Sequence, residues 1–301
     1  MFRAGFAGNL SDSVFKTING HAGFKLTGAL NTCKADTAKS DIIPFLSADM
    51  LLENNDVLII HQTSYGIPEL LEEALRRSKP VMLMDITGFD SVTVNKLLKL
   101  QEEAHSIIKV TYPARTNPAL NKSVPFITHP FFIEAKLSAS LNKYEAEERW
   151  ATGALLKMLD AIFFLCNHNF RKINSFRFPP GMSSNGLISG RIEFDNGSVA
   201  NILISELTED EIFTLDIYQM KNTLNVDMLN QKFECIEKNR QKNRIDSLTK
   251  SYAVTETQLL HNELDGFYNS IINKDTSGRE LFEASRLLEL CRKFTGQPIS
   301  G

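Results

Sequence analysis

The sequence FRAGFAGNLSDS at residues 2–13 places a short apolar run, a glycine-bearing turn and the polar start of a helix in direct succession. We expect a strand over residues 2–7 and a helix over residues 11–19. Ser11 or Asp12 is the expected helix cap, because both side chains accept hydrogen bonds from the first turn. A strand followed at once by a helix is the repeating unit of parallel α/β sheets.

The strand–helix alternation continues through the first third of the chain. Residues 57–61 read Val-Leu-Ile-Ile-His, a mostly apolar run that is typical of a strand buried on both faces of a parallel sheet. The further expected strands are 24–30, 81–84 and 106–111, and the expected helices are 67–77 and 92–104. This order predicts a doubly wound parallel sheet with right-handed crossovers.

The pattern changes after Pro118, where Asp195-Asn196-Gly197 is a hairpin signal between two strand-like runs. The expected strands here are 132–141, 173–178, 186–194, 198–206, 213–219 and 223–227, and the expected helices are 151–166, 256–273 and 279–295. We interpret the basic stretch 239–250 as a solvated loop. The predicted class is therefore α/β. Residues 1–118 form a Rossmann-type, nucleotide-binding-like domain with a doubly wound parallel sheet. Residues 119–301 form an α+β substrate or dimerisation domain with a mostly antiparallel open sheet and C-terminal helices.

The composition excludes several classes of partner. The 301 residues carry a net charge of −3, and the pI is near 6.1. No basic field therefore indicates binding to nucleic acid or to an anionic membrane. The four cysteines form no C-x-x-C pair and no zinc-type cluster, so we expect a reducing compartment and no metal. The chain opens on no apolar signal region and has no run long enough to span a bilayer, so a cytoplasmic location is expected.

The first turn holds only part of the glycine pattern that binds a pyrophosphate. In one register Gly8 is the first glycine, and Leu10 and Ser13 replace the second and the third. In the other register Phe6 replaces the first glycine, Gly8 is the second, and Ser11 replaces the third. The first register puts a leucine side chain where a diphosphate must come close. The expected cofactor contacts in this turn are Gly8, Asn9 and Leu10.

In Rossmann folds an acidic residue after the second strand normally accepts hydrogen bonds from the ribose hydroxyls, and this sequence has no acidic residue there. Asn31, Thr32 and Lys34 lie about 20 residues past the turn, after the second expected strand. Without a carboxylate the site would not repel a 2′-phosphate, and Lys34 could attract one. We therefore favour NADP over NAD as the cofactor. The alternative is a Rossmann-shaped domain that binds no dinucleotide.

Seven segments in fixed order carry a resemblance to one family: 8–11, 55–64, 78–87, 112–119, 153–156, 192–198 and 277–280. Residues 78–87 look like the strand that ends in a Glu-Lys-Pro signature, and residues 112–119 resemble an Arg-x-Asn-Pro-Ala segment. Together the segments resemble the Gfo/Idh/MocA oxidoreductases, which include glucose–fructose oxidoreductase, inositol dehydrogenase and biliverdin reductase. The resemblance covers nearly the whole chain and favours the second register of the turn. It implies an NAD(P)-dependent oxidoreductase fold, a sugar-like small-molecule ligand, and a homodimer or higher homo-oligomer formed through the open face of the second sheet.

The chain departs from the family where the resemblance implies proton transfer. The Glu-Lys-Pro signature maps to Asp85-Ile86-Thr87, and the aspartate and histidine of the catalytic helix map to Lys157 and Ala161. Isoleucine and alanine move no protons, so the usual sugar-alcohol dehydrogenation is expected to be lost. A buried Lys157 steadied by Asp160, three residues further on, could restore proton transfer or bind an anionic ligand. The alternative is an ion pair at the domain boundary.

The remaining candidates follow a buried strand. His61, Gln62 and Tyr65 lie at the carboxyl end of residues 57–61, where doubly wound folds bind ligands, and Asp85 is a further candidate for cofactor contact. His105, Trp150 and His168 belong to no catalytic constellation. Two hypotheses remain: a catalytically silent relative that binds a ligand or has a regulatory role, and a divergent NADP-dependent oxidoreductase that uses Lys157.

Overall fold

The chain folds into two compact units in the computed structural model, which describes residues 1–8, 10–30, 43–44, 47–61, 67–139, 147–166, 169–178, 186–206, 210–239, 244–251, 256–277 and 279–295. The first unit comprises Met1–Thr111 and Thr255–Leu288, and the second comprises Tyr112–Val254 and Glu289–Gly301. The expected division at residue 118 assigned both C-terminal helices to the second domain. In the structure the first unit ends at Thr111, and the chain returns to it near its C-terminus.

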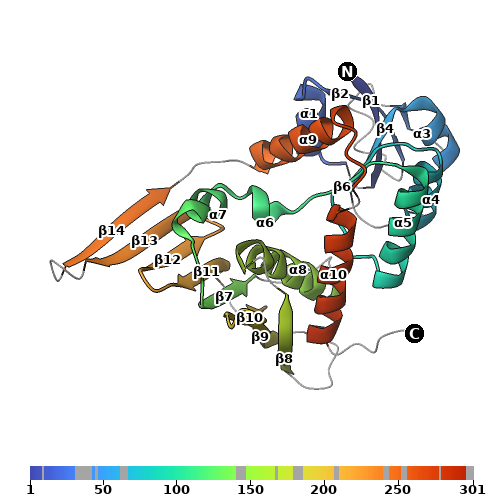
Figure 1. Cartoon of the computed structure of the whole chain (residues 1–301). Helices are drawn as coiled ribbons and strands as arrows, with labels where there is room; N and C mark the ends of the chain where they lie inside the picture. Colours follow the sequence, from blue (N-terminus) through green and yellow to red (C-terminus); the bar gives the residue numbers. More distant parts are fainter. Residues whose placement is uncertain are drawn as a thin grey trace. The chain divides into compact units, whose positions relative to one another are not determined.

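A parallel sheet forms the centre of the first unit, with the strand order β3-β2-β1-β4-β5-β6 (Figure 1). The strands are β1 (Phe2–Gly8), β2 (Phe24–Leu30), β3 (Ile43–Pro44), β4 (Val57–His61), β5 (Val81–Leu83) and β6 (Ile108–Val110). The strand order reverses between β1 and β4, so the carboxyl ends of these two strands mark the switch point of the sheet. The predicted doubly wound sheet is confirmed.

Helices bury the faces of this sheet. Those that lie in the connections between its strands are α1 (Asp12–Gly20), α3 (Ala48–Asn54), α4 (Ile67–Arg76) and α5 (Ser91–Ala104), and α9 (Glu256–Ile272) comes from the C-terminal part of the chain. The first four residues of β4 are fully buried, as its apolar sequence predicted. From α9, Leu264 and Phe267 enter the core cluster that surrounds β1 and β2. Burial of these side chains explains why the chain returns to the first unit.

An eight-stranded sheet forms the second unit, with the order β14-β13-β12-β11-β7-β10-β9-β8. Its strands are β7 (Phe132–Ser138), β8 (Phe170–Phe178), β9 (Leu187–Phe194), β10 (Val199–Ser205), β11 (Ile212–Tyr218), β12 (Asn222–Asp227), β13 (Lys232–Asn239) and β14 (Arg244–Ser251). β7 and β10 pair in parallel, and the other neighbours pair antiparallel. The predicted mostly antiparallel sheet is therefore confirmed.

The interpretation of residues 239–250 as a solvated loop is wrong. Residues 244–251 form the edge strand β14, which pairs with β13 in a register that places Cys235 opposite Leu248. Charged residues hide the apolar alternation of these strands, because an edge strand needs charges that discourage pairing with other chains. Phe233 of β13 is fully buried all the same.

The helix α8 (Glu147–Cys166) covers one face of the second sheet, together with the short helices α6 (Pro113–Thr116) and α7 (Pro118–Ser123) and the 3-10 turn η1 (Val124–Phe126). Residues of β7 and β10 that face α8 are buried, such as Ile133 and Ile202. The alternate residues lie on the opposite, open face, where Leu203 is partly exposed. Within the described residues, no helix is both long and apolar enough to cross a bilayer.

Candidate functional site

The turn after β1 is built around Gly8, whose φ of 117° favours glycine over any side chain. Leu10 is buried and packs in the core cluster with Ile18 and Phe24, so its side chain does not lie where a diphosphate would approach. Phe6 is also buried in that cluster. These positions favour the register in which Gly8 is the close-approach glycine. Asn9 lies outside the described residues.

Two of the protein's own side chains already stabilise the start of α1. The Ser11 side chain caps the helix, because its Oγ accepts a hydrogen bond from the Val14 N–H at 3.3 Å. Asp12 follows in the first turn with an exposed carboxylate. An acid here stabilises the helix dipole but repels a phosphate at the same helix end. The sequence interpretation treated Asp12 only as an alternative cap and missed this electrostatic role.

His61 ends β4 beside the turn. It pairs in register with Gly8 of β1, and its ring stacks on Phe6 with centroids 6.5 Å apart. His61 and Gly8 therefore share the carboxyl edge of the sheet at its switch point. The other predicted contacts at this edge lie outside the described residues: Asn31, Thr32, Lys34, Gln62 and Tyr65.

The segment after β5 corresponds to the family's Glu-Lys-Pro signature, and in this structure it forms a turn that hydrogen bonds between Asp85 and Thr87 close. The Asp85 carboxylate accepts hydrogen bonds from the Thr87 N–H at 2.8 Å and from the Thr87 hydroxyl at 2.7 Å. Ile86 between them is buried. Asp85 thus orders its own loop, and the buried side chain at the expected lysine position carries no proton.

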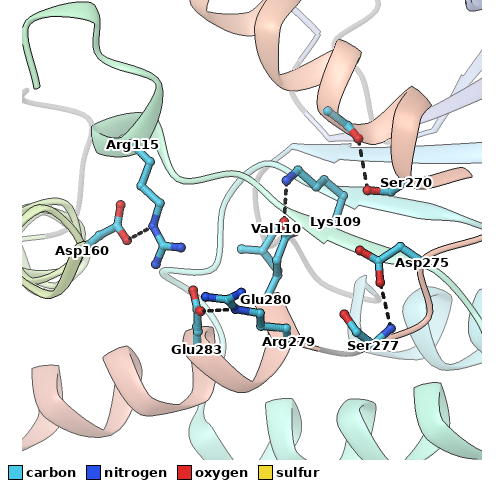
Figure 2. Close-up of polar contacts among 11 residues, drawn as sticks. Lys109, Val110, Arg115, Asp160, Ser270, Asp275, Ser277, Arg279, Glu280 and Glu283 are labelled. Atoms are coloured by element: carbon cyan, nitrogen blue, oxygen red, sulfur yellow. Dashed lines mark hydrogen bonds and ion pairs between the residues drawn. The ribbon is translucent and has the colours of Figure 1, made fainter. Parts of the chain in front are cut away.

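The predicted partnership of Lys157 and Asp160 on α8 differs in the structure. Lys157 is exposed, so the expectation of a buried lysine is wrong. Asp160 is buried, and its Oδ1 accepts a hydrogen bond from Arg115 Nε at 2.6 Å (Figure 2). Two positions three residues apart on a helix lie roughly 60° apart around its axis. That angle lets Asp160 point toward α6 while Lys157 points toward solvent. Ala161, at the expected histidine position, is fully buried.

Arg115 belongs to the Arg-x-Asn-Pro-Ala segment and has a structural role that sequence reasoning missed. Its guanidinium carbon lies 4.1 Å from the centroid of the Tyr112 ring, which fixes the side chain beside Asp160. Asn117 caps α7, since its Oδ1 accepts from the Ala119 N–H at 3.0 Å, and its Nδ2 donates to the Met228 carbonyl at 2.8 Å. A buried acid on an apolar helix requires a cation, and this requirement was the available sequence signal.

The other candidates carry no chemistry among the described residues. Burial raises the pKa of the Cys166 thiol to about 12 and also raises the pKa of Cys291, so neither provides a thiolate nucleophile. His105 ends α5 in the left-handed conformation with φ 49°, and its N–H donates to the Gln101 carbonyl. Trp150 is buried on α8. His168 lies outside the described residues.

The sequence matches no protein-family model, and no relative was found among curated proteins. Solved structures, in contrast, match over nearly the whole chain. UDP-N-acetylglucosamine 3-dehydrogenase GnnA from Acidithiobacillus ferrooxidans is 16% identical with a TM-score of 0.81, and the match covers 97% of this chain and 96% of that one. The dehydrogenase MviM from Clostridium difficile is 17% identical with a TM-score of 0.79, and the match covers 97% and 99%.

Biliverdin reductase from Synechocystis sp. PCC 6803, solved with biliverdin and NADP+, is 15% identical with a TM-score of 0.77 and coverage of 98% and 99%. Gfo/Idh/MocA-type dehydrogenases are thus among the structures that the chain resembles. The predicted resemblance is confirmed at the level of the fold. At identities this low the likeness shows the fold alone.

We predict that Arg115→Met lowers the free energy of unfolding by about 2 kcal/mol, because it leaves the buried Asp160 carboxylate without its cation. Urea denaturation followed by circular dichroism measures the loss. Adding Asp160→Leu should recover most of it, since both charges are then absent. Arg3→Met removes an exposed pair with Asp56 and is the matched control, for which a smaller loss is expected. An unchanged urea midpoint for Arg115→Met would show that the pair is unimportant.

Proposed function

We propose that the protein is a catalytically silent relative of the Gfo/Idh/MocA-type dehydrogenases that binds a sugar-like small molecule. One observation carries the proposal. The positions where the resemblance implies a proton-carrying lysine and histidine hold Ile86 and Ala161, which are 8% and 0% exposed. Neither side chain can transfer a proton.

The loss matters because hydride transfer at a hydroxyl-bearing carbon requires a proton acceptor within hydrogen-bond reach of the hydroxyl. Such acid–base help contributes roughly 10²–10⁴ in rate. Asp160 and Lys157, the polar side chains on this part of α8, do not replace the missing acid–base group. Asp160 is paired with Arg115, and Lys157 is exposed on the helix surface.

For the cofactor we propose NADP rather than NAD, bound weakly. The left-handed Gly8 beside His61 at the switch point supports a dinucleotide at this edge. The absence of an acid at Asn31 and Thr32, with Lys34 nearby, favours a 2′-phosphate. The Asp12 carboxylate opposes the phosphates and limits the affinity. Among the similar structures, levoglucosan dehydrogenase was solved with NADH and biliverdin reductase with NADP+.

We predict that the purified protein transfers hydride between NADP and polyols at least about 10²-fold more slowly than a dehydrogenase with both proton carriers. Absorbance of the reduced nicotinamide measures the rate. The competing hypothesis is an active oxidoreductase that uses Lys157. If the protein turns over, and Lys157→Ala abolishes turnover while the exposed Lys99→Ala on α5 does not, the competing hypothesis is correct and the proposal is wrong.

We predict that Asp12→Asn tightens NADPH binding about two- to fivefold, because one charge at a helix end is worth about 0.3–1 kcal/mol. Thermal-shift titrations with NADPH, NADP, NADH and NAD measure the affinities, since a ligand at a hundredfold excess over Kd stabilises the fold by about 2.7 kcal/mol. Glu102→Gln removes the same charge near the end of α5, ahead of β6 and away from the carboxyl ends of the strands, and should change nothing. If no nucleotide shifts the midpoint of either the unchanged chain or the Asp12→Asn variant, the protein has no dinucleotide site.

We also propose that two copies associate through the open face of the second sheet in the cytoplasm. Phe176 and Phe178 of β8 are 58% and 51% exposed, and Leu203 of β10 is 36% exposed. Phe176 pairs with Ser189 and so lies on the face opposite the buried Ile188. Exposed aromatic side chains on a broad sheet are typical of an interface. The described cysteines are free and buried, as in proteins of a reducing compartment.

Phe176→Asp should convert dimers to monomers, because it places a charge within the apolar part of the interface. Analytical ultracentrifugation over a concentration series measures the dissociation constant. Phe282→Asp is the matched control, since Phe282 is similarly exposed, at 52%, but lies on the helix α10 (Arg279–Thr295). A monomeric protein before any substitution, or equal effects of both variants, would contradict this interface.

A further inference from the structure

Three side chains of the first unit converge away from the turn after β1. His21 follows α1, and His261 and Asp265 lie on α9. One ligand atom from each lies within 4.8 Å of the others. We propose that these three residues bind a divalent transition-metal ion such as Zn²⁺ and that the ion ties α1 to α9.

Side-chain packing holds α9 against the segment between α1 and β2 without an ion. His261 and Asp265 are four residues apart and so share one face of α9. A Cβ on Gly23 would lie 2.3 Å from Cδ2 of Tyr268, so the absence of a side chain lets α9 approach the start of β2 this closely. Phe24 and Phe267 stack behind the cluster with centroids 5.5 Å apart. The ligands therefore come from rigid elements, which favours metal binding by reducing the entropy lost.

His21 is the buried member of the cluster, with a side chain that is 4% exposed. Its ring stacks on Phe24 at 5.1 Å and lies 4.9 Å from the ring of His261. The Nε2 atom lies 3.0 Å from Oδ1 of Asp265. His261 and Asp265 reach the surface, so an ion could enter from solvent without opening the core.

The donor set selects the class of metal. Two imidazole nitrogens and one carboxylate oxygen suit Zn²⁺ and other late divalent metals, whereas Mg²⁺ and Ca²⁺ prefer sites made of oxygen. Three protein ligands leave one position of a tetrahedral zinc site for water. No described cysteine takes part in this cluster, which explains why a search of the sequence for zinc-type cysteine and histidine spacing did not find it.

One hydrogen bond limits the affinity of the site. The Gly23 N–H donates to Nδ1 of His21 at 3.0 Å, so the proton of the neutral ring lies on Nε2 and is donated to Asp265. A metal on Nε2 must displace this proton, and a proton moved to Nδ1 would oppose the Gly23 N–H. A buried N–H left without an acceptor destabilises the zinc-bound state, so we expect a lower zinc affinity than at a site of the same ligands without this hydrogen bond.

The site is separate from the proposed nucleotide edge. His21 lies past the C-terminal end of α1, whereas Ser11 and Asp12 lie at its N-terminal end. A helix of nine residues is about 13 Å long. Metal binding and dinucleotide binding can therefore be lost independently, and a failure of one does not imply a failure of the other.

Titration of the purified, chelator-treated chain with Zn²⁺ against a chromophoric chelator tests the site. We expect one Zn²⁺ per chain, a rise in thermal midpoint with Zn²⁺ but not with Mg²⁺, and at least a roughly tenfold weaker affinity for His261→Ala and for Asp265→Asn. These two residues reach the surface, so the variants should fold. His129→Ala, an exposed histidine of the second unit, should bind as the unchanged chain does. Equal zinc affinity in the unchanged chain and the His261 variant, or no zinc binding, would overturn the proposal.

The role of His21 has its own readout. Zinc bound to Nε2 leaves the proton of the neutral ring on Nδ1, so we expect the ring-nitrogen resonances of His21 to move in nitrogen-15 NMR spectra when zinc is added. The resonances of His129, in the second unit, are the control and should not move. Resonances of His21 that stay unchanged in the zinc-loaded chain would remove His21 from the site. NADPH titrations of the same variants should remain unchanged, whatever affinity the unchanged chain has.

Discussion

The packing of α9 on the start of the first sheet is the interaction on which the arrangement of the first unit depends. It requires a position without a side chain at Gly23, where the Tyr268 ring occupies the space of a Cβ. Around this contact, Phe24 stacks on Phe267 and the core closes over β1 and β2. The chain must therefore return to its first unit after completing the second sheet, which is why a division into two consecutive segments does not describe it.

A second contact holds the returning chain in place. Glu280, in the first turn of α10, pairs with Lys109 of β6 and accepts a hydrogen bond from the Val110 N–H at 2.8 Å (Figure 2). The acid also suits the positive end of the helix dipole. Both partners are mostly shielded from solvent, at 19% and 28% exposure, so the pair is less screened than a surface ion pair. The end of the sheet and the start of α10 are thus joined within the first unit.

Local patterns in the sequence predicted most of the fold. Apolar runs gave β2 and β4 with their observed bounds, and the helix-capping rule correctly included Ser11. Local sequence patterns did not predict features that depend on contacts between residues far apart in the chain. The sequence marked Lys157 and Asp160 as the polar residues of the apolar segment 153–166, but the cation that pairs with the buried Asp160 is Arg115, which is 45 residues away in sequence. The sequence did not predict the cluster of His21, His261 and Asp265 for the same reason, because Asp265 is 244 residues away from His21 in sequence.

The described residues of the turn after β1 and of the loop after β5 are stabilised by the protein's own groups. Ser11 caps α1, and Leu10 packs in the core next to the turn. Asp85 accepts a hydrogen bond from the Thr87 N–H within its own loop. At the other end of α1, the His21 N–H bonds to the Ile18 carbonyl at 3.2 Å, and Asn19 accepts from the Leu26 N–H at 2.9 Å. None of these bonds needs a phosphate as a partner. A fold whose helix ends are satisfied by its own groups does not need a bound cofactor for its stability, so this architecture can form whether or not a dinucleotide binds.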